Sequence, residues 1–194
     1  LQKVRIQREQ GRRSRTRAEI PTVSLVGYTN AGKSTLFNRV TQSSVYVADQ
    51  LFATLDPTLR RVELENVGPV ILADTVGFIA HLPHKLVEAF KATLEETLNA
   101  DLLLHVVDGS SPERREQIEQ VQKVLREIEA DHIPQITAFN KIDLTGEAPR
   151  LERDEAGKAT RVFLSAASGA GVELLLQALS EHSRRDRVTQ CLRL

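Results

Sequence analysis

The sequence predicts an α/β protein whose sheet is mostly parallel and is flanked by helices on both faces. Short apolar runs alternate along the chain with segments whose apolar residues recur every three or four positions. Apolar runs without polar alternation are typical of strands buried on both faces of a parallel sheet. Ligands of such sheets bind at the carboxyl ends of the strands, so the residues at those ends are the first candidates for function.

Each expected element follows from a local pattern. The apolar runs TVSLVG, PVILA and LLLHVV predict strands over residues 22–27, 69–73 and 102–107. Weaker patterns predict strands over 135–139 and 161–164, and the alternating segment 59–64 suits an edge strand. Helices are expected over residues 33–41, 83–100, 112–130 and 172–184. The sheet would then bring four strand ends to one edge, namely Gly27, Asp74, Asn140 and Ser165.

The composition fits a globular protein that needs no covalent cross-link. Of 194 residues, 41% are hydrophobic and 27% are charged, and a chain of this length can bury roughly 70% of its unfolded surface. The single cysteine, Cys191, excludes a disulfide within the chain and favours a reducing, cytoplasmic compartment. No apolar run approaches the ~18 residues of a membrane span, and the N-terminus lacks a secretory pattern.

Charge is distributed unevenly along the chain. The net charge is zero, but residues 1–19 hold seven basic and two acidic residues. Two interpretations of this basic arm stay open: it lies near a polyanion such as RNA, or it is a solvated helix end or linker. Because the chain starts at Leu1 and contains no methionine, we expect it to be part of a longer polypeptide.

Residues 27–34 (GYTNAGKS) fit the pattern G-x-x-x-x-G-K-[ST] at every fixed position, between an expected strand and an expected helix. The glycines let the backbone turn tightly so that its N–H groups face phosphate oxygens, and the helix N-terminus adds partial positive charge. The Lys33 ammonium can bridge the outer phosphates, and the Ser34 hydroxyl can bind Mg²⁺. The loop predicts that a nucleoside triphosphate is bound through Gly27, Tyr28, Thr29, Asn30, Ala31, Gly32, Lys33, Ser34 and Thr35.

A second pattern, N-K-x-D, follows the expected strand 135–139 and consists of Asn140, Lys141, Ile142 and Asp143. Guanine presents N1–H and the exocyclic amine side by side, and the Asp143 carboxylate can accept from both, whereas adenine offers no such pair. The Lys141 stem can lie over the base, and Asn140 can tie this loop to the phosphate loop. Backbone N–H groups of Ser165, Ala166 and Ala167 can meet the guanine O6. The pattern alone is also typical of a turn, but after a phosphate loop it favours guanine.

Asp74, Thr75, Val76 and Gly77 follow the expected strand 69–73. The Asp74 carboxylate can hold a water on Mg²⁺, and the Gly77 N–H can contact the terminal phosphate. The irregular segment before this strand contains Thr54 and Thr58, and either hydroxyl can complete the Mg²⁺ shell when the γ-phosphate is present. Loss of that phosphate would release both segments, which is an order–disorder switch.

The segments GYTNAGKST, FATLDPTLR, DTVGF, NKID and SAASGAG together resemble the HflX family of translation-associated GTPases, which is close to Obg. The resemblance implies the P-loop GTPase fold, a ribosome-associated GTPase, and the large ribosomal subunit with its RNA as partner. It favours Thr54 over Thr58 as the metal ligand, with Ser34 and Asp74, and it adds Phe52, Ala53, Thr54, Leu55 and Asp56 to the nucleotide-binding residues. The implied organisation is a basic helical tail or linker over 1–20 from a missing N-terminal domain, a GTPase domain over 21–184 and a C-terminal tail over 185–194. We expect a monomer.

Many GTPases place a glutamine directly after D-x-x-G to orient the attacking water, and here that position is Phe78. We therefore expect slow intrinsic turnover, assisted by a partner, a polar residue of the switch segment, or a monovalent cation. Potassium-activated GTPases resemble this chain in having asparagine at Asn30, although Asn30 also suits the loop backbone alone. The catalytic candidates are Lys33, Thr54, Gly77 and Asn30. The alternatives to a GTP-hydrolysing switch are a guanine-nucleotide-binding regulatory module without turnover of its own and an RNA-binding module.

Overall fold

The computed structural model describes residues 20–42, 58–75, 77 and 97–191 of the chain. Within these residues the fold is a seven-stranded sheet in the order β2-β3-β1-β4-β5-β7-β6. The five central strands are parallel, and the two edge strands, β2 and β6, pair antiparallel with their neighbours. The expected α/β fold with a mostly parallel sheet is confirmed.

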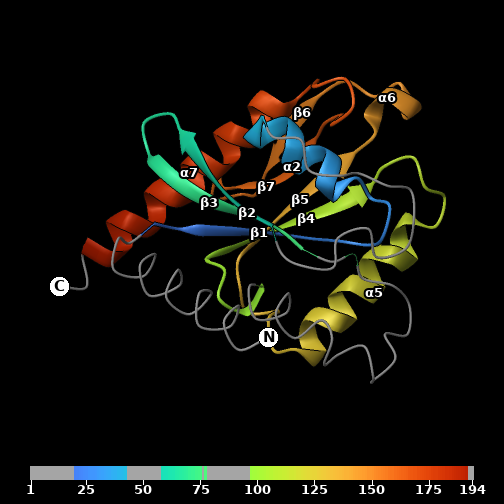
Figure 1. Cartoon of the computed structure of the whole chain (residues 1–194). Helices are drawn as coiled ribbons and strands as arrows, with labels where there is room; N and C mark the ends of the chain where they lie inside the picture. Colours follow the sequence, from blue (N-terminus) through green and yellow to red (C-terminus); the bar gives the residue numbers. More distant parts are fainter. Residues whose placement is uncertain (1–19, 43–57, 76, 78–96, 192–194) are drawn as a thin grey trace.

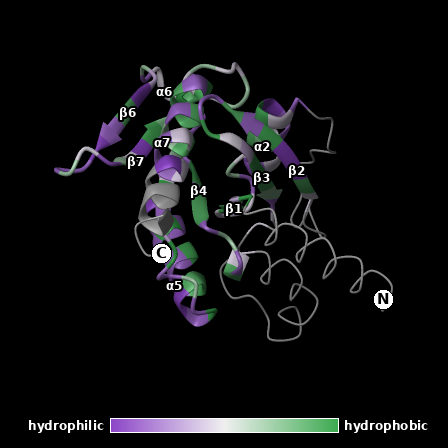
Figure 2. Ribbon diagram, turned by 90° about the vertical axis from the view of Figure 1, so that its left-hand side faces the viewer, coloured by the Kyte–Doolittle hydropathy of each residue, from purple (hydrophilic) through white to green (hydrophobic). Residues whose placement is uncertain are grey.

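The strands follow the apolar runs of the sequence closely. They comprise β1 (Thr22–Val26), β2 (Thr58–Leu64), β3 (Gly68–Asp74), β4 (Leu102–Asp108), β5 (Gln135–Asn140), β6 (Arg150–Arg153) and β7 (Ala159–Phe163). All five residues of β1 and the first six of β4 are buried, because both strands lie in the middle of the sheet and are covered on both faces. Figure 2 shows the contrast between the hydrophobic β4 and the hydrophilic edge strand β6.

Helices cover both faces of this sheet (Figure 1). The described helices are α2 (Lys33–Thr41), α5 (Arg114–Glu127), α6 (Ile142–Thr145) and α7 (Val172–Cys191). Helices α2 and α7 pack on one face, where Phe37 and Leu175 join the core with Leu104 of β4. Helix α5 packs on the other face, where Val121 and Leu125 contact a second apolar cluster. None of the helices in the described ranges is long and apolar enough to cross a bilayer.

The structure differs from some of the expected elements, and one of them lies largely outside the described residues. It adds the short helix α6 and the edge strand β6, which the sequence patterns did not predict. Helix α7 runs to Cys191, beyond the expected end at residue 184, so the segment 185–191 is helical. Most of the expected helix 83–100 lies outside the described residues, and its described end is helical only at residues 97–98.

Candidate functional site

The loop between β1 and α2 needs glycine at two positions. Gly27 has φ +151°, and a Cβ there would lie 2.2 Å from the Val106 carbonyl oxygen. Gly32 has φ +93° at the start of α2, and a Cβ there would lie 2.3 Å from Asn140 Nδ2. Side chains at either position would collide with the neighbouring strands, so the glycines let the loop wrap closely against the ends of β4 and β5.

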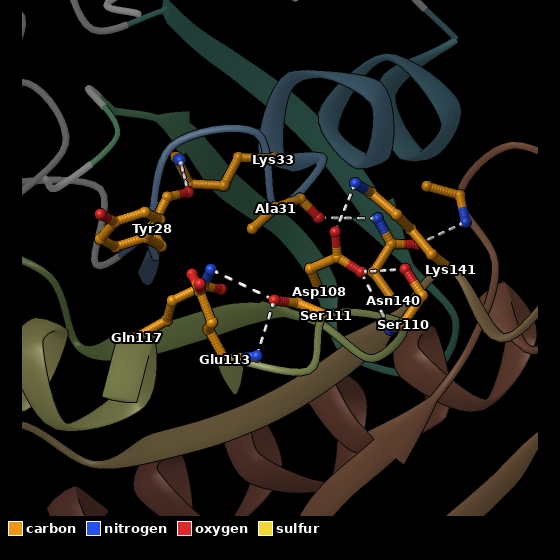
Figure 3. A network of polar contacts seen from close by, with 11 residues as sticks. Tyr28, Ala31, Lys33, Asp108, Ser110, Ser111, Glu113, Gln117, Asn140 and Lys141 are labelled. Carbon is orange, nitrogen blue, oxygen red and sulfur yellow. Dashed lines mark hydrogen bonds and ion pairs between the residues drawn. The ribbon is translucent and has the colours of Figure 1, made fainter. Parts of the chain in front are cut away.

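Lys33, the first residue of α2, is buried beneath this loop. Its ammonium donates to the carbonyl oxygen of Gly27 at 3.2 Å and to that of Tyr28 at 3.0 Å (Figure 3). Burial lowers the pKa of Lys33 to about 8, and the negative charge of Asp74 opposes this shift. Gly77 lies directly against this group, because a Cβ there would be 3.1 Å from Lys33 Nζ and 2.9 Å from Thr29 Cα. A positive charge and the backbone of the D-T-V-G segment therefore meet at one point.

Ser34 and Asp74 form an oxygen pair beside Lys33. The Ser34 hydroxyl donates to Asp74 Oδ2 at 2.7 Å, joining the first turn of α2 to the end of β3. A hydroxyl and a carboxylate so close together are the hard oxygen donors that Mg²⁺ prefers. The donor set present in the described residues therefore fits a magnesium ion, with room in its shell for phosphate oxygens and water.

Asn140 connects three separate loops. Its side-chain Nδ2 donates to the Ala31 carbonyl at 3.0 Å, and its Oδ1 accepts from the Ala166 N–H at 2.8 Å. The residue is only 3% exposed, so both bonds lie away from water. Figure 3 shows Asn140 between the phosphate loop and the chain that follows β7. A single side chain thus fixes the distance between the predicted phosphate and base sites.

The loop 165–169 after β7 uses most of its own N–H groups. Ser165 N–H donates to Ala170, Ser168 N–H donates to the Ser165 hydroxyl, and Gly169 N–H donates to the Ser165 carbonyl. Within the described part of the chain, the Ala167 N–H has no acceptor. The Arg39 guanidinium of α2 donates to the carbonyls of Ala166 and Ala167 in the same loop.

Lys141 and Asp143 lie at the same edge of the sheet. Lys141 has a left-handed backbone with φ +68°, and its ammonium forms an ion pair with Asp108 Oδ2 at 2.6 Å. Asp143 lies in the first turn of α6 and is exposed. An exposed carboxylate is available to a ligand, and the α6 turn holds it beyond the end of β5.

The structure brings the predicted residues of four strand ends together, but some of them point inward. The Thr75 side chain is buried and donates to the Leu25 carbonyl, and the Ile142 side chain is buried in the core. Asn30 is exposed with φ +59°, a backbone conformation that asparagine tolerates well. Phe52, Ala53, Thr54, Leu55, Asp56, Val76 and Phe78 lie outside the described residues, so their predicted roles stay predictions.

Sequence reasoning missed three residues of this region, namely Arg39, Asp108 and Ser110. The signal for Asp108 was present, because it is a polar residue at the carboxyl end of a buried strand, like Asp74 and Asn140. Ser110 and Arg39 carry no comparable signal in the sequence. Ser110 bonds to the Asp108 side chain two residues away. Arg39 bonds to backbone carbonyls that lie 127 and 128 residues away.

The site has the features of a P-loop GTPase domain. They are a phosphate-binding loop on a parallel sheet, an N-K-x-D loop tied to that loop, and a serine–aspartate oxygen pair. Comparison with protein families agrees, since residues 22–141 match the family described as "50S ribosome-binding GTPase". The chain belongs to this family, within its HflX group. It is 59% identical over its full length to the protein named GTPase HflX of Escherichia coli (strain K12) and 52% identical over 90% of its length to that of Magnetococcus marinus.

The chain spans 46% and 40% of the lengths of these two relatives. Among solved structures, a GTP-binding protein from Sulfolobus solfataricus in complex with GDP superposes with a TM-score of 0.66 at 26% identity. That match covers 93% of this chain and 58% of the other. The expected family and the P-loop GTPase fold are therefore confirmed.

Proposed function

We propose that this chain binds GTP and hydrolyses it to GDP and phosphate, and that the bound nucleotide switches its association with the large ribosomal subunit. The observation that carries the proposal is the position of Asn140, which ties the phosphate loop to the loop after β7 through two buried hydrogen bonds. This arrangement holds Lys33 and the exposed Asp143 at one edge of the sheet. The names of the relatives and the description of the family support the same function.

Guanine recognition rests on three groups in this proposal. The Asp143 carboxylate accepts from guanine N1–H and the exocyclic amine, and both bonds are charge-assisted. The Ala167 N–H donates to the guanine O6, since the neighbouring N–H groups of the loop already have acceptors. The Lys141 stem covers one face of the base. Adenine would leave the carboxylate unpaired, which is the source of discrimination.

Phosphates and metal occupy the other half of the site. The triphosphate takes the place of the Gly27 and Tyr28 carbonyls as the partner of the Lys33 ammonium. Ser34, Asp74 and the predicted ligand Thr54 would hold Mg²⁺, which supplies charge neutralisation at the β- and γ-phosphates. The Gly77 N–H contacts the terminal phosphate, because Gly77 packs against Lys33 and Thr29.

Hydrolysis is slow without assistance in this account. Phe78 cannot orient water, so we expect an intrinsic rate of the order of 10⁻⁴ to 10⁻² s⁻¹. A ribosomal particle, a polar residue of the switch segment, or a K⁺ ion beside Asn30 can supply the missing stabilisation. The ribosomal partner also implies action in the cytoplasm, with the basic arm of residues 1–19 near RNA. We expect the chain to act as a monomer.

The test has a binding stage and a turnover stage. Fluorescent GDP is bound to the chain and displaced by GTP, GDP, ATP or ADP, and we expect guanine nucleotides to compete at least about 100-fold better. Displacement by ATP at the same concentration as GTP would refute the guanine site. Single-turnover hydrolysis is then followed with and without large ribosomal subunits, and faster turnover with the subunits is expected. If the chain binds GTP but hydrolyses none in either condition, it acts as a guanine-nucleotide-binding regulatory module, and the proposed hydrolysis is wrong.

Potassium dependence is tested separately. The rate of GTP hydrolysis is compared in KCl and NaCl at equal ionic strength, with Asn30→Ala as the variant. A higher rate in KCl that is lost in Asn30→Ala supports a cation at Asn30. Equal rates in the two salts remove the cation and leave the left-handed backbone as the reason for asparagine.

A further inference from the structure

The turn after β4 is braced directly against the N-K-x-D loop. Asp108 and Asn140 are register partners at the ends of the neighbouring parallel strands β4 and β5. The Gly109 N–H donates to the Asn140 carbonyl at 2.8 Å, and a Cβ at Gly109 would lie 2.9 Å from that oxygen. The Arg114 guanidinium of α5 holds the Gly109 carbonyl at 2.9 Å. Both backbone polar groups of Gly109 are therefore bonded, one to Asn140 and one to Arg114, and these bonds hold the turn in place.

Both carboxylate oxygens of Asp108 are used in this turn (Figure 3). Oδ1 accepts from the Ser110 N–H at 2.9 Å and from the Ser110 hydroxyl at 2.6 Å. Oδ2 accepts from the Lys141 ammonium at 2.6 Å. Burial alone would raise the pKa of Asp108, but the bonds from Lys141 and Ser110 outweigh it and lower the pKa, so the group stays ionised.

This geometry has a consequence for Lys141. A lysine side chain is long and flexible, and ordering such a side chain on binding costs roughly 0.5–1.5 kcal/mol. Here the Lys141 backbone is set by a positive φ and its ammonium is held by Asp108, so both ends of the stem are fixed. The Asp108 side chain is 18% exposed and its other oxygen is already bonded to Ser110, which sets this pair apart from mobile surface ion pairs.

We propose that Asp108 is a positioning residue for nucleotide binding, which holds the Lys141 ammonium so that the aliphatic stem lies ready over the guanine face. This inference rests on the guanine site proposed above. Asp108 itself touches no nucleotide atom. Its effect passes through Lys141, so it acts on affinity and on the rate of nucleotide release and leaves recognition of the guanine edge by Asp143 unchanged.

The first experiment measures affinity and release of fluorescent GDP for the wild-type chain, Asp108→Asn and a matched control, Asp154→Asn. Asp154 makes a similar turn in the β6–β7 hairpin, where its Oδ1 accepts from the N–H groups of Ala156 and Lys158. We expect Asp108→Asn to weaken GDP binding about 3- to 10-fold, with faster release, which corresponds to ordering one side chain. Asp154→Asn should bind as the wild type does, and equal affinity of all three chains would overturn the inference.

Two further readouts separate positioning of Lys141 from general loosening of the loop. Inosine diphosphate lacks the exocyclic amine, so the preference for GDP over it reports on Asp143 alone. We expect Asp108→Asn to keep that preference, whereas a loosened loop would lose it and contradict the inference. In a Lys141→Met chain, which keeps an apolar stem without the ammonium, Asp108→Asn should have no further effect, and an undiminished effect there would also overturn it. Failure of the wild type to bind GDP would instead refute the proposed function.

Discussion

Asn140→Ala tests the connection on which the site depends, and its effect on stability follows from the structure. The substitution removes two hydrogen bonds and leaves the Ala31 carbonyl and the Ala166 N–H without their partners. Both alanines are 1% exposed, so water replaces the lost partner poorly. An unsatisfied buried polar group costs about 1–3 kcal/mol, so two such groups, partly relieved by relaxation, should lower the free energy of unfolding by about 3 kcal/mol.

Urea unfolding followed by far-ultraviolet circular dichroism measures this change, since the chain has no tryptophan. In a thermal scan the same loss should lower Tm by about 6–12 °C for a domain of this size. Gln122→Ala is the control, because it removes one partly exposed bond, from Gln122 to Gln135 at 2.8 Å, and should cost under about 1 kcal/mol. If Asn140→Ala costs no more than this control, the buried connection does not hold the loops as described.

Three further outcomes follow from the same geometry. The pKa of Lys33 is about 8 in the free protein, and bound phosphates favour its charged form. GDP affinity should therefore fall by up to about tenfold per pH unit above pH 8. Constant affinity between pH 7.5 and 9.5 would contradict this. Burial and the charge of Lys33 lower the pKa of His105 to about 4 from 6.5, so between these values the unfolded chain binds more protons. Stability should fall by about 3 kcal/mol as pH drops from 7 to 4, and in His105→Gln the urea midpoint should lose this part of its pH dependence. A Cβ in Gly27→Ala lies 2.2 Å from the Val106 carbonyl oxygen, whereas a Cβ in Gly157→Ala meets no atom within 4 Å. Both positions have a positive φ, +151° and +72°, which strains an alanine backbone by about 1–3 kcal/mol, so Gly27→Ala should lose more stability in urea than Gly157→Ala. Equal losses would show that the Gly27 contact is relieved without cost.

The buried strands were predictable because their burial leaves a direct trace in the sequence. The segments TVSLV and LLLHVVD are mostly apolar, and the ranges that they predict, 22–27 and 102–107, end within one residue of β1 and β4. The edge strand β6 was not predictable in this way, since its residues are Arg150, Leu151, Glu152 and Arg153. Its strand conformation depends on pairing with β7, on Arg150 stacked 3.3 Å from the Phe163 ring centroid and on the ion pair between Arg153 and Glu181.

The residues of the candidate site also divide into those that a sequence pattern predicts and those that only the packing brings in. Lys33, Asp74 and Asn140 follow strands in recognisable patterns, and the structure brings them to one edge of the sheet. Asp108 belongs to no such pattern, although its place at the end of β4 is equivalent. What makes it part of the site is the contact with Lys141, 33 residues away, and contacts between separate loops are set by the packing of the strands.

Nucleotide preference in Asp143→Asn tests most directly whether the exposed carboxylate of Asp143 selects guanine, as proposed. The amide of asparagine can donate to the additional carbonyl oxygen of xanthine, so competition against fluorescent GDP should shift in favour of xanthosine nucleotides, with loss of GTP affinity. The melting temperature should stay close to that of the wild type, because Asp143 is exposed. An Asp143→Asn chain that still prefers GTP over XTP by the wild-type factor would contradict the account.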